Sequence, residues 1–116
     1  MSLTYEEAVR LFRQGDFTAI LTRSTRAISA LRGLEPRLRV IVAHALALAG
    51  ELDDARQLAK LDQYERSTPL IRSKAESVLA LVLWREADMD GALHHFHAAV
   101  RLAHESTAAD QIAWAH

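Results

Sequence analysis

The sequence predicts an all-α protein built from stacked pairs of helices. Composition is the first indication: half of the 116 residues are hydrophobic, yet only 6% are aromatic, and about a third are Leu or Ala, which are strong helix formers. The second indication is a period. Short interruptions recur at Gly15, Gly50 and Ala87, 35 and 37 residues apart. Periods of this length are typical of helical repeats.

The first pair of helices is predicted from its boundary residues. Thr4 and Glu7 form a capping box, so a helix begins there and continues to about Gln14. Gly15 can take the left-handed conformation that ends a helix. Asp16 can then cap the next helix, which we expect over residues 17–32.

The second and third pairs repeat the order of a helix, a tight turn and a second helix. Pro36 opens a helix that is apolar on nearly every side, so this helix must be covered on more than one face. Thr68 and Pro69 provide a cap and a first-turn proline for the next long helix. The predicted helices of these pairs cover residues 37–49, 52–64, 70–86 and 89–103. The predicted units cover about residues 4–34, 37–66 and 69–104.

A last helix is expected over residues 106–116, because Ser106 or Thr107 can cap it. Ile112 and Trp114 form its apolar side. Since the end units of a repeat stack need a polar outer face, this helix either closes the stack or leads into a further unit of a longer protein. We expect one domain in the 116 residues.

Composition and motifs argue against several classes of function. The absence of cysteine excludes disulfides and thiolate metal sites, and a net charge of −1 gives no general attraction for nucleic acid or an acidic membrane. Glu6 and Glu7 stand where a signal peptide would be basic, and no apolar run reaches the roughly 18 residues that cross a bilayer. The sequence has no Gly-rich phosphate loop, nucleophile elbow or His-Glu-x-x-His motif. We therefore expect a cytoplasmic protein that is not an enzyme and needs no cofactor.

The residues around the three breaks follow one pattern, in which small residues allow two helices to cross closely and larger ones fill the gap between units. They are Ala8, Leu11, Gly15, Asp16, Phe17, Ala27 and Ile28 in the first unit; Ala43, Leu46, Gly50, Glu51, Leu52, Ala55 and Ala59 in the second; and Ala80, Leu83, Ala87, Asp88, Met89, Ala92, Phe96, Ala99 and Val100 in the third. This pattern resembles the tetratricopeptide-repeat family over nearly the whole chain, and related helical-pair solenoids are the alternative. The resemblance implies a right-handed α-α superhelix of about three helix pairs plus a C-terminal helix. Ala87 stands where the pattern favours Gly, so a left-handed conformation there would be strained.

The resemblance also implies a concave groove lined by the first helix of each unit. Its expected lining is Tyr5, Val9, Phe12, Arg13, Val40, His44, Ala47, Ser77, Leu81, Trp84 and Arg85. This set is mainly apolar with a basic edge, which suits a partner peptide or an amphipathic helix anchored on Phe12, Leu81 and Trp84. The Lys and Asn residues with which some family members clamp a terminal carboxylate are missing. The alternative is that these side chains only pack inside the superhelix.

Two other kinds of partner are weighed against a peptide. Apolar end faces at residues 5–11 or 112–114 could pair two copies of the chain into a homodimer. The cations Arg23, Arg26, Arg32, Arg37 and Arg39 cluster with only Glu35 against them, as in an RNA-binding solenoid. No aromatic side chain is interleaved for base stacking, so nucleic acid is the less favoured partner. Because bacterial transcription regulators often carry tetratricopeptide-like units as a sensing segment, the resemblance also suggests that context.

The histidines of the sixth predicted helix could suggest a metal site. His94 and His97 are one turn apart, but no carboxylate or thiol stands at a matching offset. His95 and His104 belong to the same stretch. We interpret them as the solvated face of an amphipathic helix and expect no metal.

Overall fold

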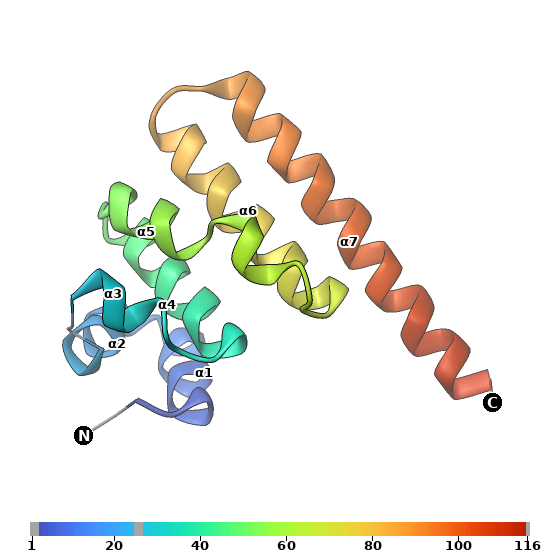
Figure 1. The fold of residues 1–116 in the computed structure, drawn as a ribbon, viewed down its shortest axis with the longest axis horizontal. Coiled ribbons are helices and arrows are strands. Elements are labelled where there is room, and N and C mark those ends of the chain that lie inside the picture. The colour runs from blue at the N-terminus through green and yellow to red at the C-terminus, as the bar shows by residue number, and fades with distance from the viewer. Residues whose placement is uncertain (1–2, 25–26, 116) are drawn as a thin grey trace.

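The computed structural model describes residues 3–24 and 27–115, with side chains as far as residue 107, and the chain is all-helical (Figure 1). Its elements are α1 (Tyr5–Arg13), α2 (Phe17–Arg23), α3 (Ile28–Leu31), α4 (Pro36–Leu48), α5 (Leu52–Leu58), the 3-10 helix η1 (Leu61–Tyr64), α6 (Pro69–Arg85) and α7 (Met89–Ala115). No strand occurs in the two described ranges. The prediction of an all-α fold is confirmed.

Three turns of one design separate the long helices. Gly15, Gly50 and Ala87 have positive φ angles of 73°, 87° and 65°. In each turn this residue donates its N–H to the carbonyl three residues earlier, and the next residue donates to the carbonyl five residues earlier, over 2.9–3.2 Å. These two bonds are the Schellman motif, which satisfies carbonyls at the end of a helix. The three breaks expected from the sequence are therefore observed.

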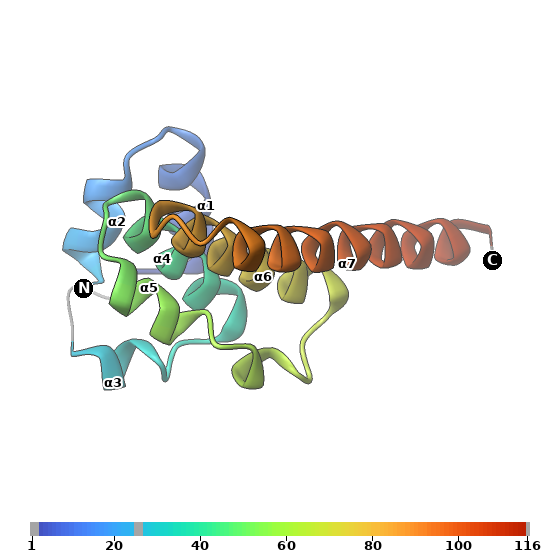
Figure 2. The same cartoon turned by 90° about the horizontal axis from the view of Figure 1, so that it is seen from above.

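The helices pack in the order of the chain. α4 contacts α1 and α2 as well as α5 and α6, and α6 contacts α5 and α7. Figures 1 and 2 show α7 beside α6 at the edge of the assembly. Because α4 has neighbours on several sides, 9 of its 13 residues are buried: Leu38, Arg39, Val40, Ile41, Val42, Ala43, Ala45, Leu46 and Ala47. The expectation that this helix is covered on more than one face is confirmed.

The second helix is shorter than the range 17–32 expected for it. α2 ends at Arg23, and α3 is a separate helix of four residues. Ser24 directs its hydroxyl to the Ile20 carbonyl over 2.6 Å. A serine that bonds to the preceding turn in this way competes with continuation of the helix.

The fourth helix is also shorter than its expected range of 52–64. α5 ends at Leu58, and the chain then forms η1. Tyr64 donates its phenolic hydroxyl to the Leu58 carbonyl over 2.5 Å, and the Gln63 side-chain amide donates to the Gln57 carbonyl over 2.8 Å. The carbonyls at the end of α5 are thus satisfied by side chains rather than by another helical turn.

The last two expected helices form one. No break occurs at Ser106 or Thr107, and α7 runs over 27 residues. Thr107 donates its hydroxyl to the Ala103 carbonyl over 3.1 Å, which is a bond within the helix rather than a cap. The alanines on either side have the highest helix propensity of any residue. Ile112 and Trp114, expected on the apolar side of a separate helix, lie outside the described side chains.

A buried arginine connects the segment before α4 with the segment after α5. Arg39 on α4 is only 7% exposed, and its guanidinium donates to the carbonyls of Arg32, Leu34 and Gln63 at 3.0 Å and to the Tyr64 hydroxyl at 3.2 Å. Its carbon Cζ lies 4.7 Å from the centre of the Tyr64 ring. This one side chain therefore ties the loop before α4 to the segment after α5, with carbonyl oxygens in place of a carboxylate.

Loss of Arg39 should destabilise the fold. Arg39→Ala leaves buried carbonyl oxygens and the Tyr64 hydroxyl without their donor, and we expect a loss of about 2–3 kcal/mol in the free energy of unfolding. Urea denaturation followed by circular dichroism measures this value. Arg32→Ala, at an exposed side chain, is the control and should change stability by less than about 0.5 kcal/mol.

The third turn should be improved by glycine. Ala87 has the left-handed conformation at φ 65°, which is strained for any residue with a Cβ atom. We expect Ala87→Gly to raise the free energy of unfolding by about 1 kcal/mol. The matched variants Gly15→Ala and Gly50→Ala should each lower it by a similar amount through strain alone, because an added Cβ meets nothing within 4 Å at either position. A stability loss in Ala87→Gly would contradict this account of the turn.

Candidate functional site

A cavity of about 340 Å³ opens where α1, α4 and α6 meet, and we refer to it as the α1–α4–α6 pocket. Its lining is Tyr5, Val9, Phe12 and Arg13 from α1, Val40, Ile41 and His44 from α4, and Lys74 and Ser77 from α6. Side chains from three helices that are far apart in the sequence therefore meet in one cavity.

The pocket has an aromatic wall. The Phe12 ring lies 4.8 Å from the His44 ring and 5.2 Å from the Phe17 ring, centre to centre. Val40 and Ile41 are buried beneath the opening. An apolar floor with aromatic sides is the usual environment for an apolar side chain of a partner or a small ligand.

Cations line part of the pocket. Arg13 and Lys74 both line it, and both side chains are exposed. His44 lies deeper: burial lowers its pKa, and the charge of Lys74 lowers it further. At neutral pH the histidine is therefore uncharged, and the two longer side chains supply the positive charge.

Most of the expected groove residues meet in this pocket. Tyr5, Val9, Phe12, Arg13, Val40, His44 and Ser77 all line it. Ile41 and Lys74 also line the pocket but were not among the expected residues. Lys74 precedes Ser77 by three residues on the same helix, and this spacing places two residues on one face, so the signal was available. Ile41 was hidden among the continuous apolar residues of α4.

The other expected lining residues lie elsewhere. Ala47 is fully buried in the core, and Leu81 is half-buried against it. Trp84 is 58% exposed and Arg85 is also exposed, and neither lines the pocket. The basic edge of the pocket is therefore formed by Arg13 and Lys74 rather than by Arg85.

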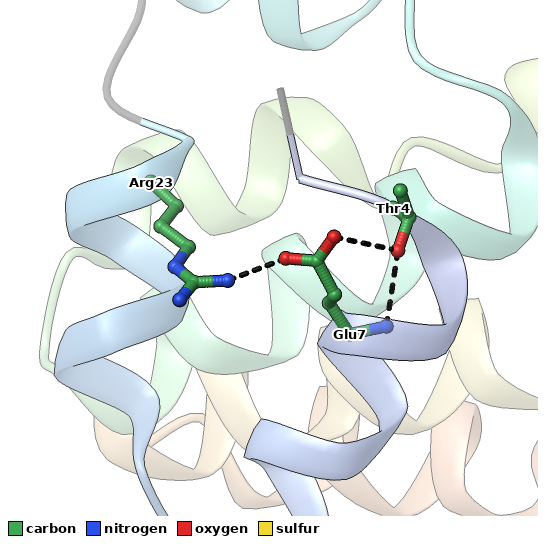
Figure 3. A network of polar contacts seen from close by, with 3 residues as sticks. All are labelled: Thr4, Glu7 and Arg23. Atoms are coloured by element: carbon green, nitrogen blue, oxygen red, sulfur yellow. Dashed lines mark hydrogen bonds and ion pairs between the residues drawn. The ribbon is translucent and has the colours of Figure 1, made fainter. Parts of the chain in front are cut away.

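Two polar contacts hold α1 beside its neighbours. Glu7 receives a hydrogen bond from the Thr4 hydroxyl and forms an ion pair with Arg23 of α2 (Figure 3). The guanidinium of Arg37, at the start of α4, lies 4.2 Å from the centre of the Tyr5 ring. Tyr5 thus both lines the pocket and contacts Arg37 of α4.

The arginines of the expected cluster make different contacts in the structure. Arg23 pairs with Glu7, Arg37 pairs with Glu35 over 3.2 Å, and Arg39 is buried. Arg39 is therefore not available to bind a phosphate, and Arg26 lies outside the described residues. Of the expected end faces, residues 5–11 already bury Ala8 and Leu11 in the core, and the side chains of residues 112–114 lie outside the described part of the chain.

His95 departs from the expected solvated face of histidines. Its Nδ1 lies 2.7 Å from a carboxylate oxygen of Glu76 on α6, and both side chains are largely shielded from solvent. His94, His97 and His104 are exposed. Among the described residues no group of three or more His, Cys, Asp or Glu is placed to hold a metal ion.

Comparison with known proteins adds no assignment. No protein-family model matches the chain, and neither the curated proteins nor the solved structures contain a significant match to it. Within the described ranges, no helix combines the length and the apolar character that crossing a membrane requires.

The buried histidine should make stability depend on pH. As the pH falls below about 6.5, the unfolded chain takes up a proton at His44 that the folded chain resists, because its folded-state pKa is lowered. Stability from this group is complete above pH 6.5 and decreases towards pH 5. We expect His44→Gln to lose less thermal stability than the natural chain over this range. Melting curves of the two chains at about pH 6.5 and about pH 5 measure this difference in melting temperature.

Lys74→Met should give a smaller effect in the same direction, because burial is the larger cause of the shift and the charge of Lys74 is the smaller one. An unchanged pH dependence in His44→Gln would show that other groups control it.

Proposed function

We propose that the chain is a tetratricopeptide-like repeat scaffold that binds a partner peptide or helix in the α1–α4–α6 pocket. The observation that carries the proposal is a single apolar cavity lined by the first helices of three successive units. Support for the repeat comes from three turns with the same hydrogen bonds, spaced 35 and 37 residues apart, and from the stepwise packing of α1, α4 and α6. A right-handed superhelix and a role in transcription regulation remain parts of this proposal.

The chemistry of the pocket defines the partner. Phe12, Val40 and Ile41 provide an apolar surface for one or two large aliphatic or aromatic side chains. Arg13 and Lys74 favour a carboxylate next to that anchor. We therefore propose a partner segment in which an apolar anchor residue is followed or preceded by Asp or Glu. Binding, rather than catalysis, is the role proposed for this site.

A peptide selection tests this role. Peptides selected from a random phage-displayed library on the whole chain should combine an apolar anchor with an acidic residue. The affinity of one labelled peptide is then measured by fluorescence anisotropy. Ser77→Phe fills the pocket from an exposed position and should raise the dissociation constant at least about tenfold, a change of roughly 1.4 kcal/mol. Lys74→Glu should weaken binding and reduce its dependence on salt.

Trp84→Ala is the matched control, because Trp84 is exposed on α6 but does not line the pocket. It should leave the affinity unchanged. Binding that is lost in Trp84→Ala and kept in both pocket variants would overturn the proposal and place the partner around Trp84, about two helical turns along α6 from Ser77.

A further inference from the structure

His44 lines the α1–α4–α6 pocket without a polar partner. The residue is half-buried on α4, and its ring lies 4.8 Å from the Phe12 ring, centre to centre. In the described part of the chain no hydrogen bond reaches either ring nitrogen, and neither nitrogen is sealed from solvent. An imidazole nitrogen that has no partner in the folded chain can donate to, or accept from, a bound molecule.

The charges that face His44 are all positive. Arg13 lines the pocket from α1 and Lys74 from α6, and Tyr5 of α1 adds a neutral hydroxyl. α2 and α5 also contact α4, but they contribute no residue to the lining, and of the described residues that line the pocket none is Asp or Glu. Arg13 and Lys74 form no ion pair with another described residue. The pocket therefore combines two unpaired cations and an unpartnered histidine with no anion.

A carboxylate in the pocket would change the surroundings of His44. In the chain by itself, burial lowers the pKa of His44 and the charge of Lys74 lowers it further. A carboxylate reverses the second cause, because it pairs with Lys74 and stabilises an imidazolium beside it. The apolar part of a ligand excludes water and acts in the opposite direction. An uncharged ligand of the same shape therefore separates the two effects.

We propose that the α1–α4–α6 pocket binds the carboxylate of its ligand between Lys74 and His44, and that His44 takes up a proton from the solvent as this carboxylate binds. The inference rests on the proposed function for the nature of the partner, and it adds a regulation of that site by pH. Over the range between the two pKa values of His44, the bound form holds more protons than the free form, so the affinity rises as the pH falls. Lysine and arginine keep their charge over this range, so their attraction for the carboxylate is constant.

The small acid 4-phenylbutanoate tests the proton uptake directly. It combines an aromatic anchor with one carboxylate, and a cavity of about 340 Å³ is in the range of small-ligand sites. The His44 ring signal of the whole chain, assigned by its loss in His44→Gln, is followed by NMR against pH. We expect 4-phenylbutanoate to raise the pKa of His44 above that of the chain alone. The uncharged 4-phenylbutanamide should leave this pKa unchanged or lower it.

Ser77→Phe, which fills the pocket, should remove the effect of 4-phenylbutanoate on His44. The proposal would be overturned by an acid that does not bind, by an acid that binds without raising the pKa of His44, or by an equal effect of the acid and the amide.

The affinity for 4-phenylbutanoate should follow the protonation. We expect its dissociation constant to fall at least about threefold from about pH 7.5 to about pH 6, since one unit of difference between the free and bound pKa corresponds to about tenfold. In His44→Gln the dissociation constant should not vary over this range. His97→Gln, at an exposed histidine of α7, is the matched control and should keep the natural pH dependence. A pH dependence that persists in His44→Gln would overturn the proposal.

The two proposals for the pocket can fail separately. Selected peptides that bind in the pocket with an affinity independent of pH would overturn the proton uptake and leave the proposed function in place. A pocket that selects no peptide, but binds 4-phenylbutanoate and protonates His44, would overturn the proposed function alone. The site would then be one for small apolar carboxylic acids.

Discussion

The fold depends on the burial of α4 on several sides. A helix with this many apolar residues is stable in water only when neighbours cover it, and here α1, α2, α5 and α6 do so. Arg39 is the buried charge on this helix, and it is satisfied by carbonyl oxygens from the segment before α4 and from Gln63 of η1. The same helix thus brings together the apolar core and the polar contacts that join the segment before α4 to η1.

The pocket follows from this arrangement. Because α4 lies between α1 and α6, any depression along its exposed edge must be lined by all three helices. Val40, Ile41 and His44 of α4 line it between the side chains of α1 and α6, and Arg13 and Lys74 add positive charge. For the proposed function, three packed helices would hold the backbone of the site in place, which lowers the entropy lost on binding a partner.

α7 is covered on fewer sides than α4. In the described part of the chain α7 packs mainly on α6, whereas α4 contacts α1, α2, α5 and α6. Met89, Leu93, Phe96 and Val100 of α7 are therefore between 40% and 55% exposed.

Local interactions were sufficient for the sequence to determine that the chain is helical and where its three turns lie. Capping residues such as Thr4 and Asp16, and the left-handed residues Gly15, Gly50 and Ala87, act within a few residues of chain, so their effects are visible in the sequence. The apolar pattern likewise determined that α4 is central, and seven of the nine residues that line the pocket are among those that the resemblance implied for a groove. Tertiary structure decided the rest. The α5 helix ends early because Tyr64 donates its hydroxyl to the Leu58 carbonyl, and Trp84 lies outside the pocket because the lining on α6 ends at Ser77, where the residues of α1 and α4 close the cavity. Such contacts join residues whose relative positions are fixed only when the helices pack, and no local pattern records them.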